Sequence, residues 1–430
     1  MTNLNDAGVV NEVPSPFCGV GTDDLSIRVT GTSIQVIENG CPVNTPAFEQ
    51  ALSDLKPRID GKTVKLDQAV RKTADILRAS KRPLIGGLAT DVNGMRAALA
   101  LADRCGAIVD NMNFSAAIRN FLVVHDSGWV NTTLAEVKNR ADLLVVVGCD
   151  LESLFPRFFE RYMWTADSMF VENTSQRQVV YLGKVPSGTA AKSPSGIPPK
   201  VLACPDADLP EVLAVLRTLV KGNPLNITEV GGISILELQR LANQLKNAKY
   251  AVLTWAAGAL NFLHADLTVQ TLCEMIKELN ASTRCSGLPL GGKEGDQTSF
   301  QVSGWQTGYP SRIDFSAGFP EYDPFLNSIE SRLADGTGDA LLWISTFNTQ
   351  RTPPANSLPS IVLGRSGMQF DQEPRVFIPV GTPGIDHKGH AYRTDNVVAV
   401  RLKKLRDTGL PQCSEVLTAI EKALSIPGGN

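Results

Sequence analysis

The sequence lacks the features that would identify several broad classes of protein. Its 41 basic and 44 acidic residues give a net charge of −3, which leaves no positive excess for wrapping nucleic acid or docking on an anionic membrane. No apolar run reaches the roughly 18 residues that span a bilayer, and the first residues form neither a basic nor an apolar signal segment. We therefore expect a cytoplasmic protein whose partners are neither nucleic acid nor membrane.

Cysteine and histidine are scarce. Eight cysteines in 430 residues, none in C-x-x-C spacing, do not suit a secreted disulfide scaffold. Of the four histidines, His125 and His264 are isolated. His387 and His390, in "DHKGH", could share a metal, but no third ligand pattern accompanies them and Gly389 favours a polar surface turn.

The common catalytic and nucleotide-binding motifs are also missing. There is no G-x-S-x-G elbow, no P-loop, and no G-x-G-x-x-G after a strand. The stretch "IGGLATDVNG" places Gly86 and Gly87 at a strand end, where a nucleotide loop and a simple tight turn are both possible.

What the sequence does contain is an alternation of helical and strand patterns. The stretch "LSIRVTGTSIQVIENG" predicts a β-hairpin near the N-terminus. After it, a helix capped by Asp67 leads to the strand 83–88, and unbroken apolar runs such as "DLLVVVGCD" suit strands buried on both faces. Strands separated by helices form βαβ units, so we predict an α/β protein with doubly wound, mostly parallel sheets and a small N-terminal hairpin lid.

Further elements follow the same logic. Strands are expected at "GAIVDN", "KYAVLTWAAG", "STRCSGLPL", "DALLWISTF", "PSIVLG" and "PRVFIPVG", and a hairpin at "HAYRTDNVVAVRLKKL". Helices are expected at 92–105, "TTLAEVKNRA", 208–220, 233–246, 265–279 and 414–424.

The length implies more than one domain, because single cores stop growing at roughly 250 to 300 residues. The Pro-, Gly- and Ser-rich stretch 183–200 indicates either a boundary or a flexible loop inside one domain. We predict a lid at 1–60, a first α/β domain at 61–185, a second at 186–345, and strands and a helix at 346–430 that complete the core.

Three stretches carry a family resemblance. They are "AIVDNMNFSAAIRNFLVVHDSGWVNTTLAEVKNRADLLVVVGCDLESLFPRFFERY", "SGWQTGYPSRIDFSAGFPEYDP" and "GIDHKGHAYRTDNVVAVRLKKL". Together they resemble the B subunit of formylmethanofuran dehydrogenase, a molybdopterin-type fold. The resemblance implies doubly wound pterin-binding domains behind a small iron–sulfur lid.

In that family the lid carries C-x2-C-x3-C before paired aspartates and a fourth cysteine after the hairpin, since a [4Fe–4S] cluster takes four thiolates. The corresponding positions here are Ser15, Cys18, Thr22 and Cys41. Hydroxyl groups are poor substitutes for soft thiolates on iron, so the resemblance implies a degenerate cluster site.

The family also places a metal-ligating cysteine and a histidine in a V-C-H-G-P turn, which fall here on Ala116 and Ala117. Neither methyl side chain can bind tungsten or molybdenum or transfer a proton. The family's D-P-R loop, expected near "FVENTSQRQ", is missing as well. We therefore expect no catalytic residue, no metal and no cofactor in this chain.

Such a degenerate chain is similar to the beta subunit of the formyltransferase/hydrolase complex of methylotrophic bacteria. The similarity implies a non-redox structural subunit whose partners are the metal-containing hydrolase (alpha), formyltransferase and glutamate-synthase-like subunits. That complex moves a formyl group from tetrahydromethanopterin to a methanofuran-like carrier and hydrolyses it to formate in formaldehyde oxidation.

Two alternatives remain open at this point. The chain could be an active tungsten or molybdenum pterin subunit that uses another ligand, such as Cys149 or Asp150 after the "VVVG" strand. It could instead be a binding module in which Arg119, Arg157 and Arg161 hold the acidic tail of the carrier, since guanidinium groups can bind carboxylates through two parallel hydrogen bonds.

Overall fold

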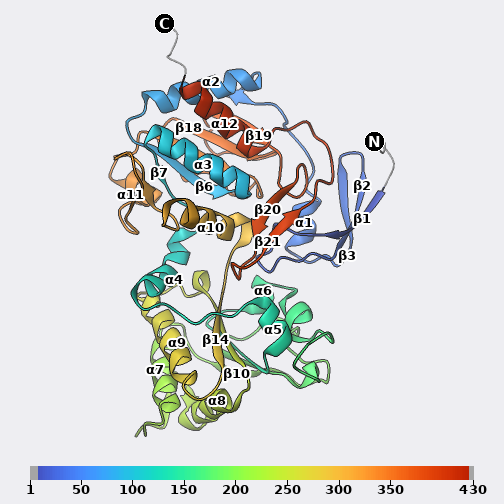
Figure 1. Ribbon diagram of the computed structural model, residues 1–430, viewed down its shortest axis with the longest axis vertical. Helices are drawn as coiled ribbons and strands as arrows, with labels where there is room; N and C mark the ends of the chain where they lie inside the picture. The colour runs from blue at the N-terminus through green and yellow to red at the C-terminus, as the bar shows by residue number, and fades with distance from the viewer. Residues whose placement is uncertain (1–7, 426–430) are drawn as a thin grey trace. The chain divides into compact units, whose positions relative to one another are not determined.

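The computed structural model describes residues 8–425, which form two compact units (Figure 1). Unit 1 is built from the chain up to Phe114 and again from Gly292 onward, and unit 2 is the segment from Ser115 to Gly291 between them. Each unit contains its own sheet and its own apolar core. None of the helices in the described part of the chain is long and apolar enough to cross a membrane.

Unit 2 contains a five-stranded parallel sheet in the order β10-β9-β8-β13-β14. Its strands are β8 (Leu143–Val147), β9 (Gln178–Gly183), β10 (Lys200–Ala203), β13 (Ala251–Ala256) and β14 (Cys285–Leu290). The main helices are α4 (Phe114–Asp126), whose first residue belongs to unit 1, α5 (Leu134–Arg140), α7 (Leu209–Val220), α8 (Ile235–Asn247) and α9 (Ala265–Leu279). Shorter elements are α6 (Leu151–Leu154), η1 (Phe159–Met163), η2 (Thr174–Gln176), β11 (Glu229–Val230), β12 (Ile233–Ser234) and η3 (Ala257–Ala259).

Unit 1 contains a nine-stranded sheet in the order β16-β15-β7-β6-β17-β18-β19-β4-β5, parallel from β7 to β19. Its parallel strands are β6 (Pro83–Ala89), β7 (Ile108–Val109), β17 (Ala340–Ser345), β18 (Ser360–Arg365) and β19 (Val376–Val380). The edge strands are β4 (Arg58–Ile59), β5 (Lys62–Thr63), β15 (Ile313–Asp314) and β16 (Glu321–Tyr322). The helices are α2 (Leu66–Ala79), α3 (Val92–Cys105), η4 (Lys293–Gly295), α10 (Asp296–Thr307), α11 (Ile329–Ala334) and α12 (Cys413–Leu424). Figure 1 shows α3 and α12 beside the strands of this sheet.

The N-terminal part of unit 1 forms a small antiparallel lid. Its strands β1 (Gly8–Val13), β2 (Leu25–Thr30) and β3 (Ser33–Glu38) pair in that order, and the helix α1 (Asn44–Phe48) follows. The ring of Phe17 packs edge-on against Phe48 and Phe347, with centroid separations of 5.0 and 6.1 Å. A second hairpin, β20 (Gly389–Tyr392) with β21 (Ala399–Leu402), lies near the end of the chain.

The structure confirms the predicted α/β class, the mostly parallel sheets and the N-terminal hairpin. The predicted Asp67 cap is wrong, because α2 begins at Leu66 and Lys65 occupies the N-cap position. The stretch 183–200 is a loop within one sheet, since β9 and β10 on either side of it pair directly. The compact units thus divide the chain differently from the predicted ranges 61–185 and 186–345.

Strand β6 is irregular where it meets β17. Gly87 has a φ of +76°, and the β6–β17 register shifts between Trp343 and Ser345. A Cβ atom on Gly87 would lie 2.5 Å from the carbonyl oxygen of Ile344 on β17. The bulge therefore requires glycine both for its backbone angle and for the close approach of the neighbouring strand.

We expect Gly87→Ala to lower the free energy of unfolding by about 3 kcal/mol, because it combines left-handed strain with a backbone clash. Urea unfolding followed by circular dichroism measures the change. Gly304→Ala is the control: Gly304 lies in α10 with nothing within 4 Å of an added Cβ, and it should be neutral or stabilising by up to about 1 kcal/mol. Equal changes in the free energy of unfolding of the two variants would show that the bulge does not require glycine at position 87.

Candidate functional site

The lid gathers the four positions that the family resemblance singled out. Ser15, Cys18 and Thr22 lie on the loop between β1 and β2 and are buried, with 3%, 7% and 0% of their surface exposed. The thiol of Cys18 donates to the hydroxyl of Thr22 over 3.3 Å, and the amide of Ser15 donates to the carbonyl oxygen of Thr22 over 2.7 Å. The loop therefore closes on itself through direct side-chain and backbone contacts.

Asn44, which sequence reasoning missed, connects the remaining positions. Its side-chain oxygen accepts a hydrogen bond from the hydroxyl of Ser15 at 2.6 Å, and its backbone N–H donates to the Cys41 sulfur at 3.4 Å. Asn44 is fully buried as the first residue of α1. Lys293 lies close enough to Cys18 and Cys41 for their sulfurs to affect its pKa, which burial lowers.

Ala116 and Ala117 lie in the first turn of α4. A Cβ built on Gly258, in η3 after strand β13, would lie 3.6 Å from the Ala116 methyl. Two residues further along, Arg119 donates to the carbonyl oxygen of Ala257 over 2.7 Å. The first two turns of α4 thus lie against η3 through a methyl group and an arginine.

Unit 1 also buries two carboxylates that the sequence did not single out as site residues. Asp296, the first residue of α10, accepts two hydrogen bonds from the side-chain amide of Asn113 at 2.9 and 3.0 Å. Asp110, directly after β7, accepts the amide of Ile329 at 3.1 Å and lies 3.4 Å from the Arg312 guanidinium. Burial raises the pKa of each carboxyl to about 7, even though these partners act in the opposite direction.

No protein-family model matches the sequence. The B subunit of the tungsten-containing formylmethanofuran dehydrogenase 2 of Methanocaldococcus jannaschii is 28% identical over 415 residues, which is 93% of this chain and 94% of the relative. The corresponding subunit of Methanococcus maripaludis is 26% identical over 92% of this chain and 94% of the relative. The B subunit of the formyltransferase/hydrolase complex Fhc of Methylorubrum extorquens is 28% identical over 76% of this chain and 85% of the relative.

Two solved structures extend these similarities. The first is the crystal structure of the formyltransferase/hydrolase complex of M. extorquens with methylofuran. One of its chains matches with a TM-score of 0.72 and 26% identity, over 86% of this chain and 98% of that chain. The chain is homologous to B subunits of formylmethanofuran dehydrogenase and of the Fhc complex. The acetylene hydratase of Pelobacter acetylenicus, with a TM-score of 0.62, 9% identity, and coverage of 96% of this chain and 69% of that chain, shares the fold alone.

The lid of this homologue does not fit a [4Fe–4S] cluster. A cluster of eight atoms must lie between its ligands, whereas the Cys18 thiol and the Thr22 hydroxyl touch each other directly. Only two of the four positions are cysteines, and hydroxyl oxygens are hard donors that suit iron–sulfur chemistry poorly. Within residues 8–425 there is also no group of three or more His, Cys, Asp or Glu side chains arranged to hold a metal ion.

The proposed substitute ligands after β8, Cys149 and Asp150, have structural roles instead. Cys149 is 1% exposed, and burial raises the pKa of its thiol to about 12, which disfavours the thiolate that binds metal. Asp150 is the N-cap of α6 and accepts the amides of Glu152 and Ser153 at 3.2 and 3.5 Å. These contacts count against either residue as a pterin-metal ligand.

The histidine pair of "DHKGH" is not assembled as a metal site. His387 is buried, and its ring nitrogens lie 2.8 Å from the Lys388 carbonyl oxygen and 3.2 Å from the Gly381 carbonyl oxygen, so both are used within the fold. His390 lies on β20 with its side chain exposed. The expectation of a surface turn is wrong for His387, because it and the adjacent ion pair between Asp386 and Arg406 are buried.

The arginines proposed for carrier binding also have structural partners. Arg157 is only 5% exposed and donates from Nε to Glu160 at 3.1 Å, with a second contact from Nη2. Arg161 follows one turn later in η1 and is half-buried. Arg157 is therefore buried and paired within the fold.

The buried Asp296 makes stability depend on pH. Its folded pKa of about 7 lies above the ordinary value of 3.8, so folding favours the protonated form. This contribution is present below about pH 4 and is lost as the pH rises through about 7.

We expect Asp296→Asn to raise the free energy of unfolding above that of the parent by on the order of 2 kcal/mol at pH 8. The difference should be smaller at pH 4, where the parent carboxyl is protonated. Urea unfolding across pH 4 to 8 measures this difference. The exposed Asp67→Asn serves as the control and should show no such trend. A stability difference that grows toward low pH would show that folding does not raise the pKa of the Asp296 carboxyl.

Proposed function

We propose that the chain is a non-redox structural subunit of a cytoplasmic formyltransferase/hydrolase complex. The observation that carries the proposal is the direct contact of the Cys18 thiol with the Thr22 hydroxyl, in a lid where the redox relatives' family has a four-thiolate motif. Hydrolysis of a formyl group transfers no electrons, so one chain of such a complex can lose its electron relay without loss of the overall reaction.

The proposed partners are the metal-containing hydrolase subunit, the formyltransferase subunit and a glutamate-synthase-like subunit of the same complex. Homology to the B subunit of Fhc, and the structural match to a chain of the complex crystallised with methylofuran, support this assignment. In the proposed reaction the complex moves formyl from tetrahydromethanopterin to a methanofuran-like carrier and hydrolyses it to formate. This chain holds the other subunits and contributes no reacting group.

A second candidate function is a tungsten–pterin redox subunit. In its favour, the tungsten-containing relatives align with 93% and 92% of this chain, whereas the Fhc relative aligns with 76%. The alanines of α4 and the closed lid count against it, because neither provides a soft ligand.

Elemental analysis of the purified complex separates the two candidates. We expect less than one iron per copy of this chain beyond any held by the other subunits, and no stoichiometric tungsten or molybdenum. Formate-dependent reduction of a viologen dye should also be absent. Four irons per chain, or one tungsten or molybdenum, would overturn the proposal.

A gain-of-ligand variant provides the matched test of the lid. After incubation with iron and sulfide, the parent should gain no visible charge-transfer absorption, whereas Ser15→Cys with Thr22→Cys restores four cysteines and should gain some. The variant Ser33→Cys with Thr63→Cys adds the same number of thiols outside the lid loop and should behave like the parent. A brown parent protein would contradict the assignment.

A further inference from the structure

A large polar cavity lies in unit 2, at the edge of the sheet where the parallel strands begin. It has a volume of about 1010 Å³. Asp142, Tyr250 and Arg284 directly precede β8, β13 and β14, while Gln178 and Lys200 are the first residues of β9 and β10. Because these strands are parallel, their first residues meet at one edge, opposite the carboxyl edge where α/β proteins usually bind ligands.

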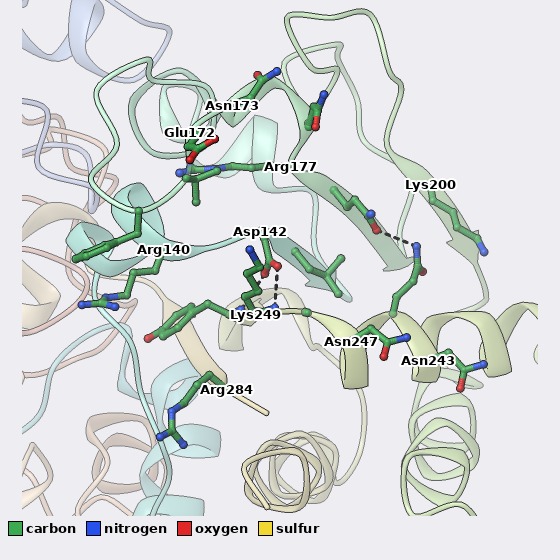
Figure 2. Close-up of a pocket in the computed structure, with 18 of the residues that line it drawn as sticks. Arg140, Asp142, Glu172, Asn173, Arg177, Lys200, Asn243, Asn247, Lys249 and Arg284 are labelled. Atoms are coloured by element: carbon green, nitrogen blue, oxygen red, sulfur yellow. Dashed lines mark hydrogen bonds between the residues drawn. The ribbon is translucent and has the colours of Figure 1, made fainter. Parts of the chain in front are cut away.

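The lining of this cavity is rich in basic side chains. Two acidic residues, Asp142 and Glu172, face six basic ones, which are Arg140, Arg177, Lys200, Arg240, Lys249 and Arg284. Figure 2 shows Arg140, Lys249 and Arg284 on one side and Lys200, Asn243 and Asn247 on the other. The chain as a whole carries a net charge of −3, so this concentration of positive charge is local.

Some of these charges already have partners. Arg140 pairs with Glu136 at 2.6 Å, and Lys200 and Arg240 share the single carboxylate of Glu237. The carboxylate of Asp142 accepts the backbone amides of Lys249 and Tyr250 at 2.8 and 2.9 Å.

Other charges at the cavity are unmatched. The side chains of Lys249 and Arg284 are exposed and have no acidic partner within residues 8–425. The backbones that carry them are neighbours, because Ala251, two residues after Lys249, donates to the Arg284 carbonyl oxygen at 2.9 Å. Lys200 and Arg240, with one carboxylate between them, leave a further unit of positive charge on the other side.

Two buried polar atoms at the cavity also lack hydrogen-bond partners among the described residues. Arg177 is 3% exposed and donates to the carbonyl oxygens of Tyr162, Met163 and Lys138, yet its Nε–H group has no partner. The side-chain oxygen of Gln244 is likewise unpaired, although its nitrogen donates to Gln178 at 3.0 Å. Both atoms are buried, so the donors that a ligand can reach are the exposed side chains of Lys249 and Arg284.

We propose that this cavity binds an extended acidic peptide segment. Its carboxylates would meet Lys249 and Arg284 on one side and Lys200 with Arg240 on the other, and its backbone N–H groups match exposed acceptors such as the Asn247 side chain. A single phosphate group fits less well, because the cations are spread along the cavity rather than converging on one point, and phosphate offers no strong donor. The proposal holds whether or not the chain belongs to a redox complex.

Isothermal titration of the full-length protein with a hexapeptide of alternating aspartate and glutamate tests this site. At about 150 mM salt the Debye length is about 8 Å, so attraction from distant charges is screened. We expect binding that Lys249→Glu and Arg284→Glu each weaken at least tenfold, with melting temperatures that stay close to that of the parent because both side chains are exposed.

Lys192→Glu is the matched control. Lys192 is exposed in the same unit and does not line the cavity, and its reversal changes the net charge by the same amount. We expect it to weaken binding less than twofold. Equal losses in all three variants, or no binding to the parent, would overturn the proposal.

A second titration, with inorganic tripolyphosphate, distinguishes a peptide site from a phosphate site. We expect tripolyphosphate to bind more weakly than the hexapeptide. Tighter binding of tripolyphosphate that is lost in the Lys249 and Arg284 variants would show a phosphate site and refute the peptide assignment.

Discussion

The contact between the Cys18 thiol and the Thr22 hydroxyl is the constraint on which the functional interpretation depends. The two side chains cannot both bind one cluster while they hydrogen-bond to each other, because the ligands of a [4Fe–4S] cluster surround it. Asn44 strengthens this arrangement, because its side-chain oxygen accepts from the Ser15 hydroxyl and its backbone N–H donates to the Cys41 sulfur. The loop is thus held by direct hydrogen bonds among its own side chains and to α1.

The lid packs through residues unrelated to cluster binding. Phe17 lies in the same loop as Cys18, and its ring contacts Phe48 of α1 and Phe347 after β17. Burying aromatic rings stabilises a fold by several kcal/mol each, which is far more than one thiol–hydroxyl contact contributes. An intact lid therefore does not require four cluster ligands, because apolar contacts hold the loop in place.

The sequence predicted the fold class and most core elements because apolar periodicity reports burial directly. The helix predicted at 92–105 and the strand "DLLVVVGCD" agree with α3 and β8. Strands β9 and β10 escaped notice because β10 alternates weakly and the loop between them is rich in proline and glycine. The order of strands could not be read from the chain, since unit 2 is inserted between two parts of unit 1 and only contacts far apart in sequence reveal it.

Some residues of the candidate site could be found from a local motif, and others could not. The positions of the cluster motif could be assigned through the family resemblance, since that motif is local in sequence. Asn44, Lys293 and Asp296 could not, because their roles come from partners such as Ser15, Cys18 and Asn113 that folding brings together.

The same reasoning explains the basic cavity of unit 2. Lys200, Lys249 and Arg284 lie 35 or more positions apart in the sequence and show no motif, but each lies at or next to the start of a strand in one parallel sheet. Helices in such a sheet end at this edge, where their carbonyl groups favour nearby cations by about 0.3 to 1 kcal/mol each. That effect accounts for basic residues close to helix ends such as Arg140 and Lys249, which lie at or just after the C-termini of α5 and α8. It does not account for Arg284, which lies five residues beyond the end of α9, so helix dipoles explain only part of the basic lining.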